Sequence, residues 1–281
     1  MPHRLVTVTI VLFWLVMTGW LVYREVVPYW LAEDVPTMQV DLTDEIGSPL
    51  VGWRVFKQDQ RIGTANSKVV RRDDRSYEFR ASYHFEKLNV GMVNIRNMEH
   101  VYRVNEDGKL KSLSAKFGVN IGKDPEAFPV ANTLIEMQGE VEDNMLEPRF
   151  LIEKKLFSFG KIDMSEQGSI VNPMLLVNRV RGLRDKKSWK ITMVDPFRTV
   201  IGKFLPALVQ QSTAVTMLIA EVRTESLFWD NKLVACYVID YIEPGKIDVT
   251  ARTWVRKLDG LVLQQEANRD SFDLVLKRVP N

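Results

Sequence analysis

Residues 77–86 read YEFRASYHFE, and this stretch decides the fold class. Apolar side chains occupy every second position from Tyr77 to Phe85, and polar side chains fill the positions between them. A period of two places one kind of side chain on each face of an extended strand. The stretch therefore predicts a strand with one face in a core and the other in water.

The same alternation returns at residues 113–121 and 247–256. Turn-forming residues lie at 105–108, 243–245 and 258–260, each between two strand-like segments, as in hairpin connections. Residues 216–224 and 233–242 are apolar on both faces, which is typical of strands covered on both sides. We therefore expect a mainly β (α+β) domain with an antiparallel sheet.

Something must cover the second face of that sheet, and two segments could do so. Residues 172–183 read NPMLLVNRVRGL, with Asn172 as a possible N-cap, Pro173 at the first helical position and Gly182 near the end. We predict a short helix here, and residues 199–211 are a second segment that could cover the sheet.

The N-terminal segment has nineteen uncharged positions, residues 5–23. At a rise of about 1.5 Å per residue this is a helix of about 28 Å, close to the thickness of a bilayer core. Positive charge precedes it at His3 and Arg4, whereas acids follow it, which favours a cytoplasmic N-terminus. A cleaved signal peptide is the alternative, but no small-x-small cleavage site follows closely. We predict a stub at 1–4, a transmembrane helix at 5–23, a linker at 24–49 and an extracytoplasmic β-rich domain at 50–281.

The composition excludes some functions. Lysine plus arginine number 38 against 36 acids, so no strong positive field indicates nucleic-acid binding. The single cysteine, Cys236, excludes an intramolecular disulfide, and its apolar surroundings favour a role in the core.

Residues that commonly carry catalysis are sparse. Of three histidines, His84 and His100 are predicted at the surface, and neither has a partner at metal-ligand spacing. Ser158 and Lys161 match the S-x-x-K spacing without its supporting motifs, and Glu140 and Glu142 fit a solvated strand face. We expect a chain that is not an enzyme and binds neither metal nor cofactor.

A cluster of basic residues follows the predicted helix: Arg179, Arg181, Arg184, Lys186 and Lys187. Cations at a helix C-terminus are stabilised by its dipole, so a structural explanation is available. The functional alternative is contact with anionic headgroups or an acidic polymer near the membrane.

Four segments carry a resemblance: GWRVFKQDQRIGTA at 52–65, NPMLLVNRVRGLRDKKSWKITMVDP at 172–196, TWVRKLDGLVLQQE at 253–266 and FDLVLKR at 272–278. Together they resemble an uncharacterised family of envelope proteins and, more distantly, the half-barrel fold of bacterial lipoprotein carriers. The resemblance implies a curved antiparallel sheet wrapped around a short helical segment, with an apolar concave face that accepts acyl chains in the carriers.

Our first hypothesis is a non-enzymatic, periplasmic, membrane-anchored protein that binds a hydrophobic or amphipathic ligand or an envelope protein partner. Its expected lining is also compatible with a filled core: Trp53, Phe79, Tyr83, Phe117, Phe150, Leu176, Trp189 and Trp254. The alternative is a structural or accessory subunit of a membrane transporter or cell-wall enzyme complex.

Overall fold

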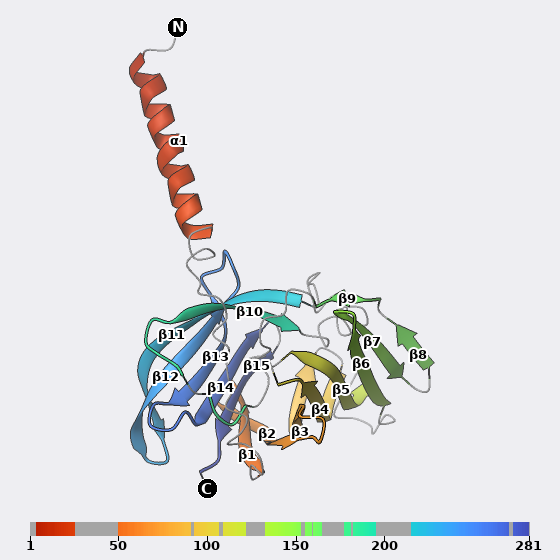
Figure 1. The fold of residues 1–281 in the computed structure, drawn as a ribbon. Coiled ribbons are helices and arrows are strands. Elements are labelled where there is room, and N and C mark those ends of the chain that lie inside the picture. The colour runs from red at the N-terminus through yellow and green to blue at the C-terminus, as the bar shows by residue number, and fades with distance from the viewer. Residues whose placement is uncertain are drawn as a thin grey trace.

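A computed structural model shows one helix that projects from a large, strongly curved β-sheet (Figure 1). It describes residues 4–25, 50–90, 93–106, 109–121, 133–152, 155–158, 160–164, 177–180, 182–194, 215–269 and 272–280. The elements are α1 (Arg4–Glu25), β1 (Val51–Lys57), β2 (Gln60–Arg71), β3 (Tyr77–Val90), β4 (Val93–Val104), β5 (Leu110–Ile121), β6 (Thr133–Glu142), β7 (Met145–Ile152), β8 (Lys155–Ser158), β9 (Ile162–Asp163), β10 (Ser188–Val194), β11 (Val215–Trp229), β12 (Lys232–Ile242), β13 (Val249–Arg256), β14 (Val262–Arg269) and β15 (Phe272–Arg278).

Two runs of hairpins form the sheet, β1 to β8 and β10 to β15, and they join where β1 pairs with β15 (Figure 1). β9 pairs with β7 beside β8. All these pairs are antiparallel, and the three predicted turns connect β4 to β5, β12 to β13 and β13 to β14. The prediction of a mainly β, antiparallel fold is confirmed.

The alternation at 77–86 is confirmed in β3. Its apolar positions from Tyr77 to Phe85 are buried, whereas Arg80, His84 and Glu86 are exposed. The exception is Glu78, which lies buried on the polar face because the guanidinium groups of Arg72 and Arg80 hold its carboxylate.

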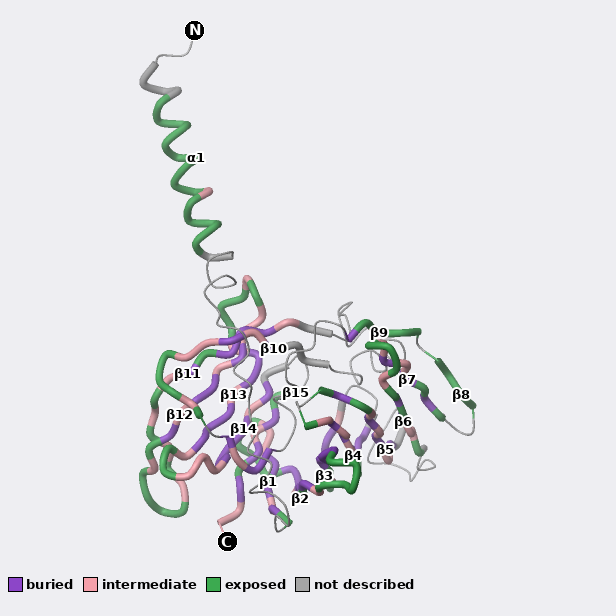
Figure 2. The backbone as a smooth tube through the Cα atoms, in the orientation of Figure 1, coloured by how far each residue is buried: buried purple, intermediate pink, exposed green. Residues whose placement is uncertain are grey.

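Consecutive positions are buried along much of β13 and β14 and in the second half of β12 (Figure 2), so both faces of the sheet are covered there. Ile239 and Tyr241 belong to the main core, whereas Cys236 and Val238 belong to a second cluster with Trp254 and Leu263. Alternate residues of a strand point to opposite faces, so the second cluster lies on the outer face of the sheet. The core position of Cys236 and the two-sided burial of this strand are confirmed, although Leu233 at its start is 73% exposed. In the stretch 247–256 the alternation is lost, because Ile247 precedes β13 and is exposed while Thr250 is buried.

The short helix predicted at 172–183 is wrong for its described residues, 177–180 and 182–183, which are not helical. Their backbone groups bond to another part of the chain: Val180 N donates to Gly260 O at 2.8 Å, and Val262 N donates to Asn178 O at 3.0 Å. These partners replace the bonds that a helix would form within itself, so the segment lies along the start of β14. Residues 172–176 and 199–211 lie outside the described residues.

Helix α1 points away from the sheet (Figure 1), and its described apolar side chains from Val8 to Tyr23 are largely exposed. In the described part of the chain, no helix combines the length and the apolar character that a membrane crossing needs. Of the linker predicted at 24–49, Arg24 and Glu25 form the end of α1, and residues 26–49 lie outside the described residues.

Candidate functional site

The aromatic residues expected to line a ligand cavity are packed in two places. Five are nine-tenths or more buried in the main core, which Phe117 also contacts: Trp53, Phe79, Tyr83, Phe150 and Trp189. Trp254 lies in the second cluster on the opposite face, so it cannot share a lining with the others. Leu176 lies outside the described residues. These side chains therefore act as core in the described part of the chain.

The predicted basic cluster lies on a turn. Arg179 is half-buried and forms a β-bridge with Leu261, Arg184 and Lys186 are exposed, Lys187 is half-buried, and Arg181 lies outside the described residues. The turn is fixed to β11, since Lys186 N donates to Val222 O at 2.8 Å and Val222 N donates to Lys187 O at 2.9 Å. The prediction that a helix C-terminus stabilises the basic cluster is therefore wrong, because its described residues form no helix.

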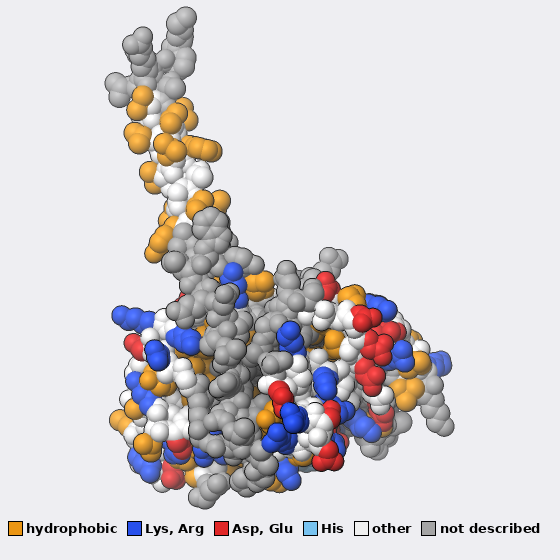
Figure 3. Space-filling view, viewed as in Figure 1, with side chains coloured by type: hydrophobic (Ala, Val, Ile, Leu, Met, Phe, Trp, Pro, Cys, Tyr) orange, Lys and Arg blue, Asp and Glu red, His pale blue; other side chains and the backbone are white. Residues whose placement is uncertain are grey.

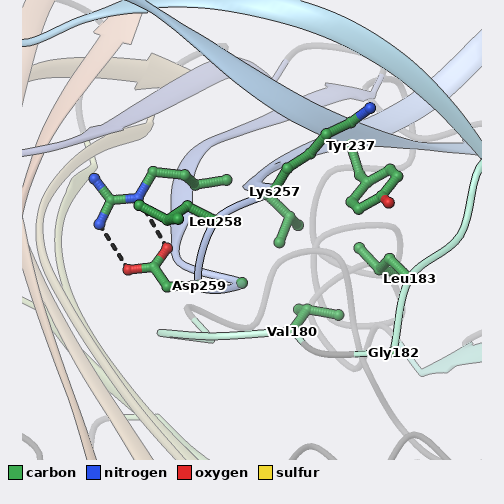
Figure 4. A pocket seen from close by; sticks show the side chains of 10 residues that line it. Val180, Gly182, Leu183, Tyr237, Lys257, Leu258 and Asp259 are labelled. Atoms are coloured by element: carbon green, nitrogen blue, oxygen red, sulfur yellow. Dashed lines mark hydrogen bonds and ion pairs between the residues drawn. The ribbon is translucent and has the colours of Figure 1, made fainter.

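A cavity of about 450 Å³ opens beside this turn (Figure 4). It is formed by segment 180–183, β12, the end of β13 and the turn that follows β13. Its lining is Val180, Gly182, Leu183, Tyr237, Val255, Arg256, Lys257, Leu258, Asp259 and Gly260. We call it the β12–β13 pocket.

The β12–β13 pocket has a mixed lining, in which polar atoms make up most of the exposed surface and aliphatic side chains form part of the wall. Val180 and Val255 are buried, Leu183 is half-buried against the main core, and Leu258 is 88% exposed at the turn. In Figure 4 the side chain of Leu183 lies beneath the Tyr237 ring, with Val180 and Gly182 on the opposite side of the space from Leu258. These groups can contact an alkyl chain or another apolar group that enters from solvent.

Two cations flank the pocket, and they are bound differently. Arg256 donates two hydrogen bonds to Asp259, at 2.8 and 2.7 Å, and this pair lowers the pKa of Asp259 and raises that of Arg256. The Lys257 ammonium donates to Thr224 Oγ1 at 3.0 Å and lies 4.7 Å from the Tyr237 ring centroid. The Thr224 hydroxyl in turn donates to Asp185 Oδ1 at 3.1 Å. Arg256 is thus neutralised by a carboxylate, whereas the partners of Lys257 among the described residues are a hydroxyl and an aromatic ring.

A second cavity of about 420 Å³ lies on the outer face of β3 to β7. Ser112 and Ser114 lie between longer side chains, which include Arg103 on one side and Glu140 and Gln138 on the other. Glu142 also lines it, and acidic side chains gather over β6 and β7 in Figure 3. The two carboxylates singled out in the sequence are therefore on a polar, water-exposed face, as predicted.

The other sequence motifs are dispersed. His84 is exposed, as predicted, and its Nδ1 lies 2.8 Å from Asn97 Oδ1. The prediction that His100 lies at the surface is wrong. Its side chain is only 5% exposed and lies on the core side of the sheet, between Tyr83 and Tyr102. Ser158 and Lys161 are both exposed at the edge of the sheet. Among the described residues, no group of three or more His, Cys, Asp or Glu side chains could hold a metal ion.

Sequence reasoning missed the β12–β13 pocket. The signal was present in TWVRKLDG at 253–260, where a lysine directly precedes a Leu-Asp-Gly turn, but this stretch predicted a hairpin and a family resemblance and no binding site. Tyr237, Lys257 and Leu183 come from three separate segments, so only the folded chain brings them together.

Comparison with known proteins gives one structural likeness. No protein-family model matches the chain, and no curated protein matches it. A solved structure, the beta-barrel-like protein of domain of unknown function DUF1849 from Brucella abortus, is similar with a TM-score of 0.42 and 10% identity, over 82% of this chain and 94% of that one. A TM-score below 0.5 falls short of a shared fold, so the fold class rests on the sheet topology of the chain itself. The resemblance to lipoprotein carriers is not tested by this likeness.

Proposed function

We propose that the chain is a non-enzymatic binding module that α1 anchors in a membrane, and that its β12–β13 pocket takes an amphipathic ligand. The observation that supports this proposal most directly is the pocket itself, in which an aliphatic part of the wall lies beside an ammonium group. Its volume of about 450 Å³ falls within the ~300–1,000 Å³ common for small-molecule sites.

The proposed anchor rests on the sequence of α1. The nineteen uncharged residues 5–23 correspond to about 28 Å of helix, close to the thickness of a bilayer core, and the apolar side chains from Val8 to Tyr23 are largely exposed. The positive charges before this run favour an N-terminus in the cytoplasm and a domain outside it, as in a bacterial periplasm.

The non-enzymatic role is supported by the residue types at the pocket. Among its described lining residues there is no serine, cysteine or histidine, the side chains that most often act as nucleophile or general base. Its one carboxylate, Asp259, is held by Arg256.

Native mass spectrometry of residues 38–281, purified from an oxidising envelope compartment without detergent, tests this function. We expect an added mass of lipid size that is lost on denaturation. Leu183→Trp should fill the pocket and abolish the added mass, whereas Leu233→Trp, at a 73% exposed position of β12, should retain it. A folded protein with a clean apo mass in all three forms would refute the proposal.

A second function, that of an accessory subunit, is favoured by the edge of the sheet at β8. All four residues of β8 are exposed, and Leu156 lies opposite Leu151 in the register. Leu134 lies on the same outer face, and these three leucines are 38–67% exposed. An exposed apolar edge strand is a site where another chain can pair. A clean apo mass combined with a defined complex in the mass spectrum would support this function.

A further inference from the structure

We infer that the ligand of the β12–β13 pocket is an anionic amphiphile, with a carboxylate or phosphate group at the Lys257 ammonium and an apolar chain against Leu183, Val180 and Leu258. This inference rests on the proposed function and adds the charge and the orientation of the ligand. It assigns Lys257 as the group that selects the ligand.

The geometry of Lys257 carries the first step. An ammonium group has three N–H donors, and one of them is directed to Thr224 Oγ1 at 3.0 Å. The Tyr237 ring on which the ammonium lies is itself a wall of the pocket, so the charge is held at the pocket edge (Figure 4). A ligand oxygen there would accept a charge-assisted hydrogen bond from a cation whose position is already fixed.

The neighbouring acids carry the second step, because each has another partner. Asp259 accepts two hydrogen bonds from Arg256, and Asp185 accepts the hydrogen bond from the Thr224 hydroxyl. Within the described part of the chain, no carboxylate lies within ion-pair distance of Lys257. The anionic partner of this ammonium would therefore come from the ligand.

The charge of the adjacent turn carries the third step. Arg184, Lys186 and Lys187 surround the single acid Asp185, and Leu183 directly before them lines the pocket. Their summed positive potential attracts anions and repels cations at this end of the sheet. The same potential disfavours a cationic amphiphile, although the aliphatic part of the wall alone would accept it.

Photo-crosslinking of the full chain in lipid nanodiscs tests the inference. The probes are four diazirine-bearing C12 compounds: the fatty acid, the alkyl phosphate, the alcohol and the alkyl-trimethylammonium. Tandem mass spectrometry locates the labelled residues. We expect the fatty acid or the phosphate to label segment 182–187 and the turn 257–260 up to about fivefold more than the alcohol or the ammonium, as an exposed ion pair allows. Lys257→Gln should remove this preference, and Lys232→Gln, a change at the exposed first residue of β12, should keep it.

The outcomes separate the two proposals and the two sources of anion. Stronger labelling by the fatty acid identifies a carboxylate ligand, and stronger labelling by the phosphate identifies a lipid phosphate group. Equal labelling of the pocket by the alcohol, or an unchanged preference in Lys257→Gln, overturns the anionic ligand while leaving the binding function standing. Absence of pocket labelling by every probe overturns both.

Discussion

The His100 ring lies in the core between two tyrosine rings, with centroids 5.5 Å from Tyr83 and 5.2 Å from Tyr102. Its Nδ1 has no hydrogen-bond partner among the described residues, and burial lowers the pKa of this imidazole to about 4. The unfolded chain binds a proton near pH 6.5, whereas the folded chain does not. The stabilising effect of the neutral ring is therefore fully present above about pH 6.5 and is lost as the pH falls toward about 4.

Between about pH 7.5 and about pH 4.5, the free energy of unfolding of the unsubstituted chain should fall by about 2 to 3 kcal/mol more than that of His100→Phe. Urea unfolding of both proteins at the two pH values measures the difference. The acids with lowered pKa, such as Glu78, titrate in both proteins and cancel in the comparison. The exposed His84→Gln is the control and should match the unsubstituted chain; an identical pH dependence in His100→Phe would contradict the assignment.

Strands β2 and β3 approach so closely at Gly63 that a Cβ atom there would lie 2.2 Å from His84 O and 3.0 Å from Phe85 Cα. Both are backbone atoms, so a side chain can be accommodated only if a strand moves. We expect Gly63→Ala to lower the free energy of unfolding by about 2 kcal/mol or more, as overpacking does. Gly52→Ala in β1 is the matched control, because its nearest contact would be 3.6 Å from Val279 Cγ2. Equal thermal midpoints for the two variants would show that β3 yields at this point.

Strands could be predicted where the alternation of apolar and polar residues alone determined which face is buried. In β3 the side chains alternate in the sequence and in the structure, because one face packs on the core. The helix expected at 172–183 failed in its described residues because Asn178 and Val180 find backbone partners at Val262 and Gly260, far along the chain. The prediction for His100 was wrong for a related reason. Its polarity indicated the surface, but the ring faces the core between two aromatic neighbours.

The pocket was less predictable than the fold. Lys257, Tyr237 and Leu183 belong to no motif in the sequence. The antiparallel pairing of β11 with β12 places Thr224 opposite Tyr237. The basic residues were identified as a cluster, but they were placed at the C-terminus of a helix and not on a turn bonded to β11. A site assembled from three segments depends on pairing that local periodicity does not contain.

The whole sheet depends on one junction, the pairing of β1 with β15, which joins its two runs of hairpins. At this junction Val55 lies opposite Leu276, and both are buried in the main core. That core is continuous across the junction, from Phe150 in β7 to Trp189 in β10. We therefore expect the two halves to unfold together.

The tryptophans allow a direct test of this cooperativity. Outside residues 1–30 they are Trp53 in β1, at the junction, and Trp189, Trp229 and Trp254 in β10 to β13, so their fluorescence reports the junction and the second run but not β2 to β8. Far-UV circular dichroism reports the strands of both halves. The two signals should give the same urea midpoint, and Leu276→Ala should lower the free energy of unfolding obtained from each signal by the same amount, about 2 to 5 kcal/mol. Leu233→Ala, at an exposed position, should shift neither. A dichroism transition with a second step that fluorescence does not follow would mean that β2 to β8 fold independently of the junction.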